Sequence, residues 1–193
     1  MTTPQPPRLR PEIVVLLSGG IDSMACADFY CAMNRRVCGM FVDYGQPAAD
    51  HEALAASAVA EHLGIPLLTL GLKGTTEPKT AGEIPGRNGF LLCAAAMERP
   101  PSVLALALGI HAGTPYADCT GEFLESAKRL LSLQMRPVDV LAPFLDWHKQ
   151  DIIAYAVKRQ LPLNITYSCE EGIVPPCGRC ASCVDRRMID ASA

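Results

Sequence analysis

Short, continuously apolar runs alternate along the chain with longer segments in which apolar residues have helical spacing. The apolar runs fall at residues 13–17, 37–42, 66–70, 103–108 and 138–142. The helix-like segments fall between and after them, at residues 23–33, 49–63, 88–97, 122–133 and 147–159. An apolar run of this kind is typical of a parallel strand buried on both faces. The alternation predicts an α/β fold with a doubly wound parallel sheet, whose loops collect at the carboxyl edge of the strands.

The other segments set the expected domain organisation. Residues 1–11 are proline-rich and are expected to be a disordered tail, residues 12–164 the α/β domain, and residues 165–193 a cysteine-containing segment packed on that domain. Residues 71–86 have no period and are expected to be a lid or insertion over a site, or a plain connection. In the helix at 49–63, one stripe along the helix surface is expected to consist of Leu54, Ala58, Val59 and His62.

Composition narrows the function mainly by exclusion. Of 193 residues, 49% are apolar and 6% aromatic, as in helices packed on a buried sheet, and the length suits one domain. The net charge of −3 does not supply the basic surface that nucleic-acid binding requires, so no direct nucleic-acid partner is expected. No apolar run reaches the roughly 20 residues of a membrane span, and the N-terminus lacks a secretory signal. We therefore expect a cytoplasmic protein without a membrane partner.

The segment Ser18–Ser23, with the sequence SGGIDS, follows the first apolar run and precedes a helix-like segment. Its two glycines let backbone N–H groups approach an anion, the helix N-terminus adds partial positive charge, and two serines add hydroxyl donors. The Gly-Lys-Ser/Thr of the Walker loop and the three-glycine spacing of dinucleotide-binding folds are both lacking. The pattern predicts a phosphate-binding loop. The alternative is a plain turn in which Asp22 or Ser23 caps the helix.

Four of the nine cysteines gather near the C-terminus, at Cys169, Cys177, Cys180 and Cys183. The repeated two-residue spacing predicts four thiolates around one metal ion, and structural zinc is expected because no ligand position is left open. An iron–sulfur cluster is the main alternative, and a redox pair is another. The other five cysteines are expected to be buried small apolar residues, of which Cys119 lies in a loop near the expected site.

Taken together, the motifs resemble a known family. SGGxDS is similar to the pyrophosphate loop of the N-type ATP pyrophosphatases, which implies an adenine nucleotide alpha hydrolase-like fold. Three further motifs, Asp43–Gln46 (DYGQ), Pro85–Asn88 (PGRN) and Tyr116–Cys119 (YADC), fit in order and in position at strand ends. With them, nearly the whole chain resembles 7-cyano-7-deazaguanine synthase of the queuosine pathway.

The resemblance implies an ATP-dependent carbon–nitrogen ligase. In that reaction ATP with magnesium adenylates 7-carboxy-7-deazaguanine, ammonia captures the acyl adenylate as an amide, and a second ATP drives dehydration to the nitrile. Asp22, Ser23 and Lys149 form the expected catalytic set, with Lys149 neutralising developing phosphate charge. The expected binding residues are Ser18, Gly19, Gly20, Asp22 and Ser23 at the phosphates, Phe41 and Asp43 at the adenosine, and Gln46, Arg87, Asn88 and Asp118 at the substrate.

Plainer structural roles stay open for several of these residues. Arg87 and Lys149 could be solvated surface charges, since exposed cations contribute little to a fold or a site. Asn88 could cap a helix, and Asp118 could cap the helix that begins near Glu122.

The chain also departs from the family pattern. Pro47-Ala48-Ala49 follows the DYGQ motif in place of basic residues, segment 71–86 is shortened, and segment 111–120 is trimmed and altered. The acceptor is therefore left open between ammonia and an amine on a partner protein, as in synthase-like proteins of antiviral defence systems. A tRNA-modifying enzyme of the same superfamily and a non-catalytic, zinc-stabilised nucleotide-binding subunit are further alternatives. A homodimer is left open.

Overall fold

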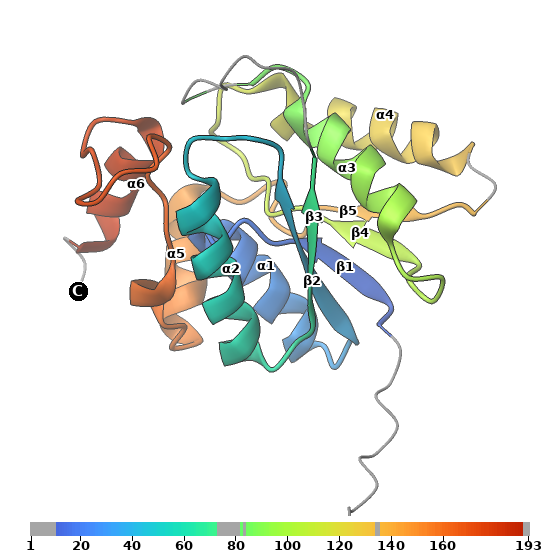
Figure 1. Ribbon diagram of the computed structural model, residues 1–193, viewed down its shortest axis with the longest axis horizontal. Coiled ribbons are helices and arrows are strands. Elements are labelled where there is room, and N and C mark those ends of the chain that lie inside the picture. The colour runs from blue at the N-terminus through green and yellow to red at the C-terminus, as the bar shows by residue number, and fades with distance from the viewer. Residues whose placement is uncertain (1–10, 73–81, 83, 134–135, 191–193) are drawn as a thin grey trace, which may run out of the picture.

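A computed structural model describes residues 11–72, 82, 84–133 and 136–190, and these form a parallel five-stranded sheet covered by helices (Figure 1). The strands are β1 (Ile13–Leu16), β2 (Val37–Asp43), β3 (Leu67–Gly71), β4 (Ala105–Ala107) and β5 (Asp139–Leu141). The α-helices are α1 (Ile21–Ala32), α2 (Ala49–Leu63), α3 (Arg87–Glu98), α4 (Gly121–Ser132), α5 (Lys149–Lys158) and α6 (Ala181–Asp190). Two short 3-10 helices are η1 (Ala117–Cys119) and η2 (Leu163–Ile165).

The strands lie in the order β3-β2-β1-β4-β5, and every pairing is parallel. At the centre, Ile13 of β1 pairs with Val37 of β2 on one side and with Ala105 of β4 on the other. The chain winds outward from β1 in one direction to β3 and then in the other direction to β5. The strand order therefore reverses at β1, which confirms the predicted α/β class and doubly wound parallel sheet.

The side chains of β1 alternate between two apolar layers. Ile13 and Val15 pack against α1, α2 and α5, whereas Val14 and Leu16 face α3 and α4. Figure 1 shows these two groups of helices on opposite faces of the sheet. A strand buried on both faces carries apolar residues at every position, which is why the period of two is not visible in its sequence.

The predicted strands and helices are found with shifts of a few residues at their ends, but the stripe predicted for α2 is wrong. Leu54 is 70% exposed and His62 is also exposed. The helix instead buries its small residues Ala55, Ala56, Val59 and Ala60. The reason is close approach of backbones: a Cβ atom placed on Gly19 would lie 2.6 Å from the Cβ of Ala55, so this face has no room for leucine.

The C-terminal segment lies beside α2 and α5, at the edge of the α/β body (Figure 1, red). It contains α6, which the sequence did not predict. The proposed boundary at residues 164–165 stays a prediction. The expected tail and most of segment 71–86 lie outside the described residues. Within the described residues, no helix has the length and apolar character needed to cross a membrane.

Candidate active site

A cleft of about 600 Å³ opens at the carboxyl ends of β1, β2 and β4. The strand order reverses here, which is where parallel α/β sheets bind ligands. Ten of the residues predicted from the sequence line it, namely Ser18, Gly20, Asp22, Ser23, Phe41, Gln46, Arg87, Asn88, Asp118 and Lys149. The fold thus brings together side chains that are far apart along the chain, although which of them bind a ligand stays a prediction.

The phosphate loop predicted at Ser18–Ser23 is the turn between β1 and α1. Gly19 has a φ of +78° and lies against α2 rather than in the cleft. Gly20 is the N-cap of α1, and no side chain caps the helix there. The capping role considered for Asp22 or Ser23 is therefore wrong, and phosphate binding by this loop stays a prediction. The N–H groups of the first turn are left available for an anion.

A lysine–aspartate pair stands beside this loop. The Nζ atom of Lys149, the first residue of α5, lies 2.7 Å from both carboxylate oxygens of Asp22. The Lys149 side chain is only 14% exposed, so the alternative of a solvated surface charge is wrong for this residue. Because a carboxylate repels phosphate, the arrangement is best suited to Asp22 holding the ammonium in place beside an anion.

The two serines of the loop face each other across it. The Ser18 hydroxyl lies 3.3 Å from that of Ser23, which in turn donates to the carbonyl of Gly20 at 2.9 Å. Ser23 is buried and Ser18 is exposed to the cleft. Ser18 is therefore the hydroxyl that can turn toward a ligand most freely.

Three further predicted residues form one cluster in the lining of the cleft. The Asn88 backbone N–H donates to the carboxylate of Asp118 at 3.1 Å, and the Asn88 side-chain amide donates to the Asp118 carbonyl at 3.1 Å. Gly86 is the N-cap of α3 and Thr120 that of α4, so the capping roles considered for Asn88 and Asp118 are wrong. Arg87 borders this cluster and the cleft.

The residues predicted in the second half of β2 and in the turn after it divide into two kinds. Phe41 and Gln46 line the cleft and are buried. Asp43 does not line it, and its carboxylate accepts the N–H of Gly45 at 2.9 Å. The binding role of Asp43 stays a prediction, but the structure places this carboxylate in the turn.

Sequence reasoning missed several residues of the cleft. Tyr44 and Glu52 line it next to Gln46, and Tyr167, Asp185 and Arg186 line it from the C-terminal segment. Tyr44 belonged to a quoted motif and could have been found from its position. The three C-terminal residues had no such signal, because only the folded cysteine segment brings them to the cleft.

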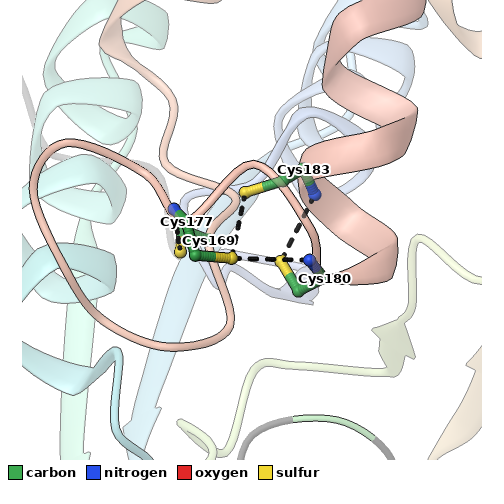
Figure 2. A group of neighbouring side chains, drawn as sticks. All are labelled: Cys169, Cys177, Cys180 and Cys183. Atoms are coloured by element: carbon green, nitrogen blue, oxygen red, sulfur yellow. Dashed lines mark hydrogen bonds between the residues drawn. The ribbon is translucent and has the colours of Figure 1, made fainter.

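The four clustered cysteines converge as predicted (Figure 2). Their sulfur atoms all lie within 4.8 Å of one another, and those of Cys177 and Cys183 are 3.9 Å apart. Sulfur atoms around one tetrahedral zinc ion at a Zn–S distance of about 2.3 Å would be about 3.8 Å apart. The site fits a single metal ion.

Backbone N–H groups support negative charge on these sulfur atoms. Cys177 N–H donates to Cys169 Sγ at 3.3 Å, and Cys180 N–H donates to Cys177 Sγ at 3.4 Å. Burial raises the pKa of Cys169, but hydrogen bonds from the N–H groups of Cys177 and Glu171 lower it, and the pKa falls to about 6. Thiolates are the form that ligates metals.

The remaining cysteines do not have these features. Cys26 and Cys38 are buried in the two apolar layers, and burial raises the pKa of both thiols. Cys119 lines the cleft, but burial raises its pKa as well. None of the three is poised as a thiolate nucleophile at neutral pH.

Among the solved structures with a similar fold is one whose description names a different function. The structure described as a predicted subunit of tRNA methyltransferase from Methanocaldococcus jannaschii matches with a TM-score of 0.58 and 15% identity, covering 77% of this chain and 76% of that one. At this identity the match shows the fold alone.

Similarity in sequence is more informative. The family model described as queuosine biosynthesis protein QueC matches residues 12–82 and 73–189. The 7-cyano-7-deazaguanine synthase of Prochlorococcus marinus (strain NATL1A) is 31% identical and covers 88% of this chain and 88% of its own. The synthases of Parasynechococcus marenigrum and Persephonella marina are 31% and 30% identical, each covering 93% of this chain and 91% of its own. The chain therefore belongs to the QueC family of enzymes, as a diverged member.

Proposed function

We propose that this chain is an ATP-dependent carbon–nitrogen ligase that adenylates 7-carboxy-7-deazaguanine and captures the adenylate with ammonia. One observation carries the proposal: the uncapped loop at Ser18–Ser23 and the Lys149–Asp22 pair open into the same cleft as Arg87 and Asp118. A site for polyphosphate thus adjoins one for a second, polar molecule. The names of the relatives supply the identity of that molecule.

In the first step, a carboxylate oxygen of the base attacks the α-phosphorus of ATP, and the bond to the departing pyrophosphate breaks. The N–H groups at the start of α1 bind the pyrophosphate, because they have no partners within the helix. Lys149 neutralises charge as it builds on the leaving group, and Asp22 orients the lysine. Magnesium accompanies ATP.

In the second step, ammonia attacks the acyl carbon, AMP leaves, and the amide forms with release of a proton. A second ATP then activates the amide oxygen by adenylation with release of pyrophosphate, and loss of AMP and of both protons from the nitrogen gives the nitrile. The same loop serves both activations, since each releases pyrophosphate.

The four cysteines hold zinc, and its role is structural. Four thiolates would occupy all four coordination positions of a tetrahedral zinc ion, so no position would be left for substrate. Burying four thiolates without a cation would be costly, and the ion offsets that cost. Elemental analysis of the purified protein distinguishes zinc from the iron of an iron–sulfur cluster.

The test is incubation of the protein with ATP, magnesium and 7-carboxy-7-deazaguanine, with and without ammonium. AMP release and the mass of the base are followed. We expect AMP and the nitrile product only when ammonium is present in excess. A test variant is Asp22→Asn, which weakens the contact with Lys149 and is expected to slow AMP release.

Other outcomes select other functions. AMP without amide or nitrile would indicate a different amine acceptor, such as one on a partner protein. AMP released only after tRNA is added would indicate a tRNA-modifying enzyme. No AMP under any of these conditions would overturn the proposal in favour of a nucleotide-binding subunit.

A further inference from the structure

A half-buried carboxylate that the proposed mechanism does not use lies in the wall of the cleft. Glu52 is in the first turn of α2 and lines the cleft next to Tyr44 and Gln46. Its backbone carbonyl oxygen lies 2.8 Å from the position a Cβ atom would take on Gly19. The backbone of Glu52 is thereby fixed relative to the phosphate loop.

Gln46 donates a hydrogen bond to this carboxylate, and the rest of its side-chain amide is also hydrogen-bonded within the protein. Its amide nitrogen donates to Glu52 Oε2 at 2.7 Å and to the Val42 carbonyl at 3.3 Å, while its amide oxygen accepts the N–H of Tyr44 at 2.9 Å. An amide nitrogen has two hydrogens, and both are used within the protein. Gln46 therefore has no N–H to donate to a ligand, although its place in the DYGQ motif led us to expect it at the substrate.

The Glu52 carboxylate can still accept further hydrogen bonds, whereas the Gln46 amide has no free N–H group. Within the described residues, Gln46 is the one hydrogen-bond partner of the carboxylate, and no ion pair with Arg87 forms within 4.0 Å. Burial raises the pKa of Glu52, and the Gln46 hydrogen bond and the Arg87 charge lower it in part. A desolvated carboxylate is stabilised by further N–H donors, so this position favours a ligand that carries them.

From this geometry, and resting on the proposed function, we infer that Glu52 recognises the amide–amidine edge of a guanine-type base. Such an edge presents a ring N–H beside an exocyclic amino group, and the two donors match a carboxylate. Adenine presents an unprotonated ring nitrogen at the corresponding place, which a carboxylate repels. Glu52 is thus a specificity-determining residue for the base, and Gln46 is its positioning residue.

The experiment measures binding of 7-carboxy-7-deazaguanine and of ATP separately by calorimetry, for the wild type and for Glu52→Gln. We expect the variant to lose at least 30-fold in affinity for the base and less than threefold for ATP. The matched control is Asp50→Asn, which removes an exposed carboxylate from the same helical turn and should leave both affinities unchanged. Glu52→Asp keeps the charge but shortens the reach, and it should give an intermediate loss.

A modified base sharpens the test. The analogue without the exocyclic amino group should bind the wild type at least tenfold more weakly than the full base, whereas Glu52→Gln should bind both alike. If Glu52→Gln binds the base as the wild type does, or loses base and ATP affinity equally, the inference is overturned. If the wild type binds ATP but not this base at all, the proposed function itself falls. Thermal unfolding of each variant separates a loss of affinity from a loss of fold.

Discussion

The α/β body and the C-terminal segment are held together in different ways. The body has an apolar layer on each face of the sheet, with Val14 and Val15 fully buried. In residues 166–187, by contrast, Cys169 and Cys183 are the buried residues, and Val174 is 71% exposed. The segment has no apolar core of its own. Its fold must therefore depend on the metal site and on contacts with the body.

Those contacts reach the phosphate loop directly. The Tyr167 N–H donates to the carbonyl of Gly19 at 3.1 Å, and the Tyr167 ring stacks on His51 with centroids 4.8 Å apart. Arg186 of α6 donates to the Leu163 carbonyl at 2.6 Å. One wall of the cleft is thus built by a segment whose four cysteines can hold a metal ion, while the loop it faces is set by the body.

Removing the metal should produce the largest effect and should separate the two regions. In Cys180→Ser we expect residues 166–190 to lose protection from hydrogen exchange while β1 to β5 keep theirs. Structural zinc in small domains contributes on the order of 10 kcal/mol, more than the other contacts of the segment can replace. Mass-resolved hydrogen exchange, together with metal content, provides the measurement.

Cys31→Ser is the control for this prediction, because Cys31 is a half-buried cysteine at the end of α1, away from the metal site. It should keep its metal and its protection pattern. Equal protection of residues 166–190 with and without metal would show that the segment is ordered by the body. That result would contradict the proposed difference between the two regions.

Replacing the lysine at the phosphate loop tests whether the chemistry belongs to the body. Lys149→Met leaves Asp22 as an uncompensated negative charge beside the phosphates, so we expect AMP release to slow by about 10² to 10³-fold. The fold of both regions should be unchanged. Lys158→Met, at the far end of the same helix, should release AMP at the wild-type rate. A loss of less than threefold in Lys149→Met would remove Lys149 from the mechanism.

A single methyl group on the phosphate loop tests how tightly the body holds it. Gly19→Ala adds a Cβ atom 2.6 Å from Ala55 Cβ at a φ of +78°, and we expect a loss of roughly 2–4 kcal/mol in the free energy of unfolding. Gly64→Ala has a φ of +64° but open space around it, so it should cost about 1 kcal/mol. Urea unfolding of both variants measures the difference, and equal losses would show that α2 yields to the methyl group.

The body could be predicted from the sequence because its signals are local. Apolar runs such as residues 13–17 give strands, and the SGGIDS motif gives a loop whose position between strand and helix is fixed by the chain itself. The family and the doubly wound sheet were predicted correctly for this reason. The four cysteines were also found from their spacing, since ligand spacing reflects the geometry of a metal.

The segment and the cleft walls were harder to predict because their placement depends on packing. Arg186 reaches the cleft only because α6 folds back onto the segment that holds Leu163 and Thr166, and α6 has no apolar run of its own. The stripe of α2 was wrong because close approach to Gly19 selects alanine over leucine, which no helical period reveals. Glu52 was missed because its place in the cleft wall depends on how α2 packs against residues of other elements, such as Gln46.

The smallest effect is expected at an ion pair inside the body. It tests how much a polar contact contributes to the free energy of unfolding where an apolar core already exists. The buried carboxylate of Asp28 accepts from Arg159 Nε at 2.8 Å and from the Tyr155 hydroxyl at 2.6 Å, joining α1 to α5. Burial raises the pKa of Asp28, but the hydrogen bonds from Arg159 and Tyr155 outweigh it and the pKa is lowered. The contribution to stability is therefore present above the unfolded-state pKa of about 3.9 and is lost as pH falls through the folded-state pKa.

Asp28→Asn should accordingly lower the free energy of unfolding by about 1–2 kcal/mol at pH 7, a modest value because the Arg159 side chain is 44% exposed. The gap to the wild type should narrow as pH falls below about 4. Both proteins carry the same cysteines, so any loss of metal in acid cancels in the difference. Glu125→Gln, which breaks the exposed pair with Lys128, should cost less than about 0.5 kcal/mol at either pH. A gap that stays constant with pH would mean that Asp28 stabilises the body through its shape rather than its charge.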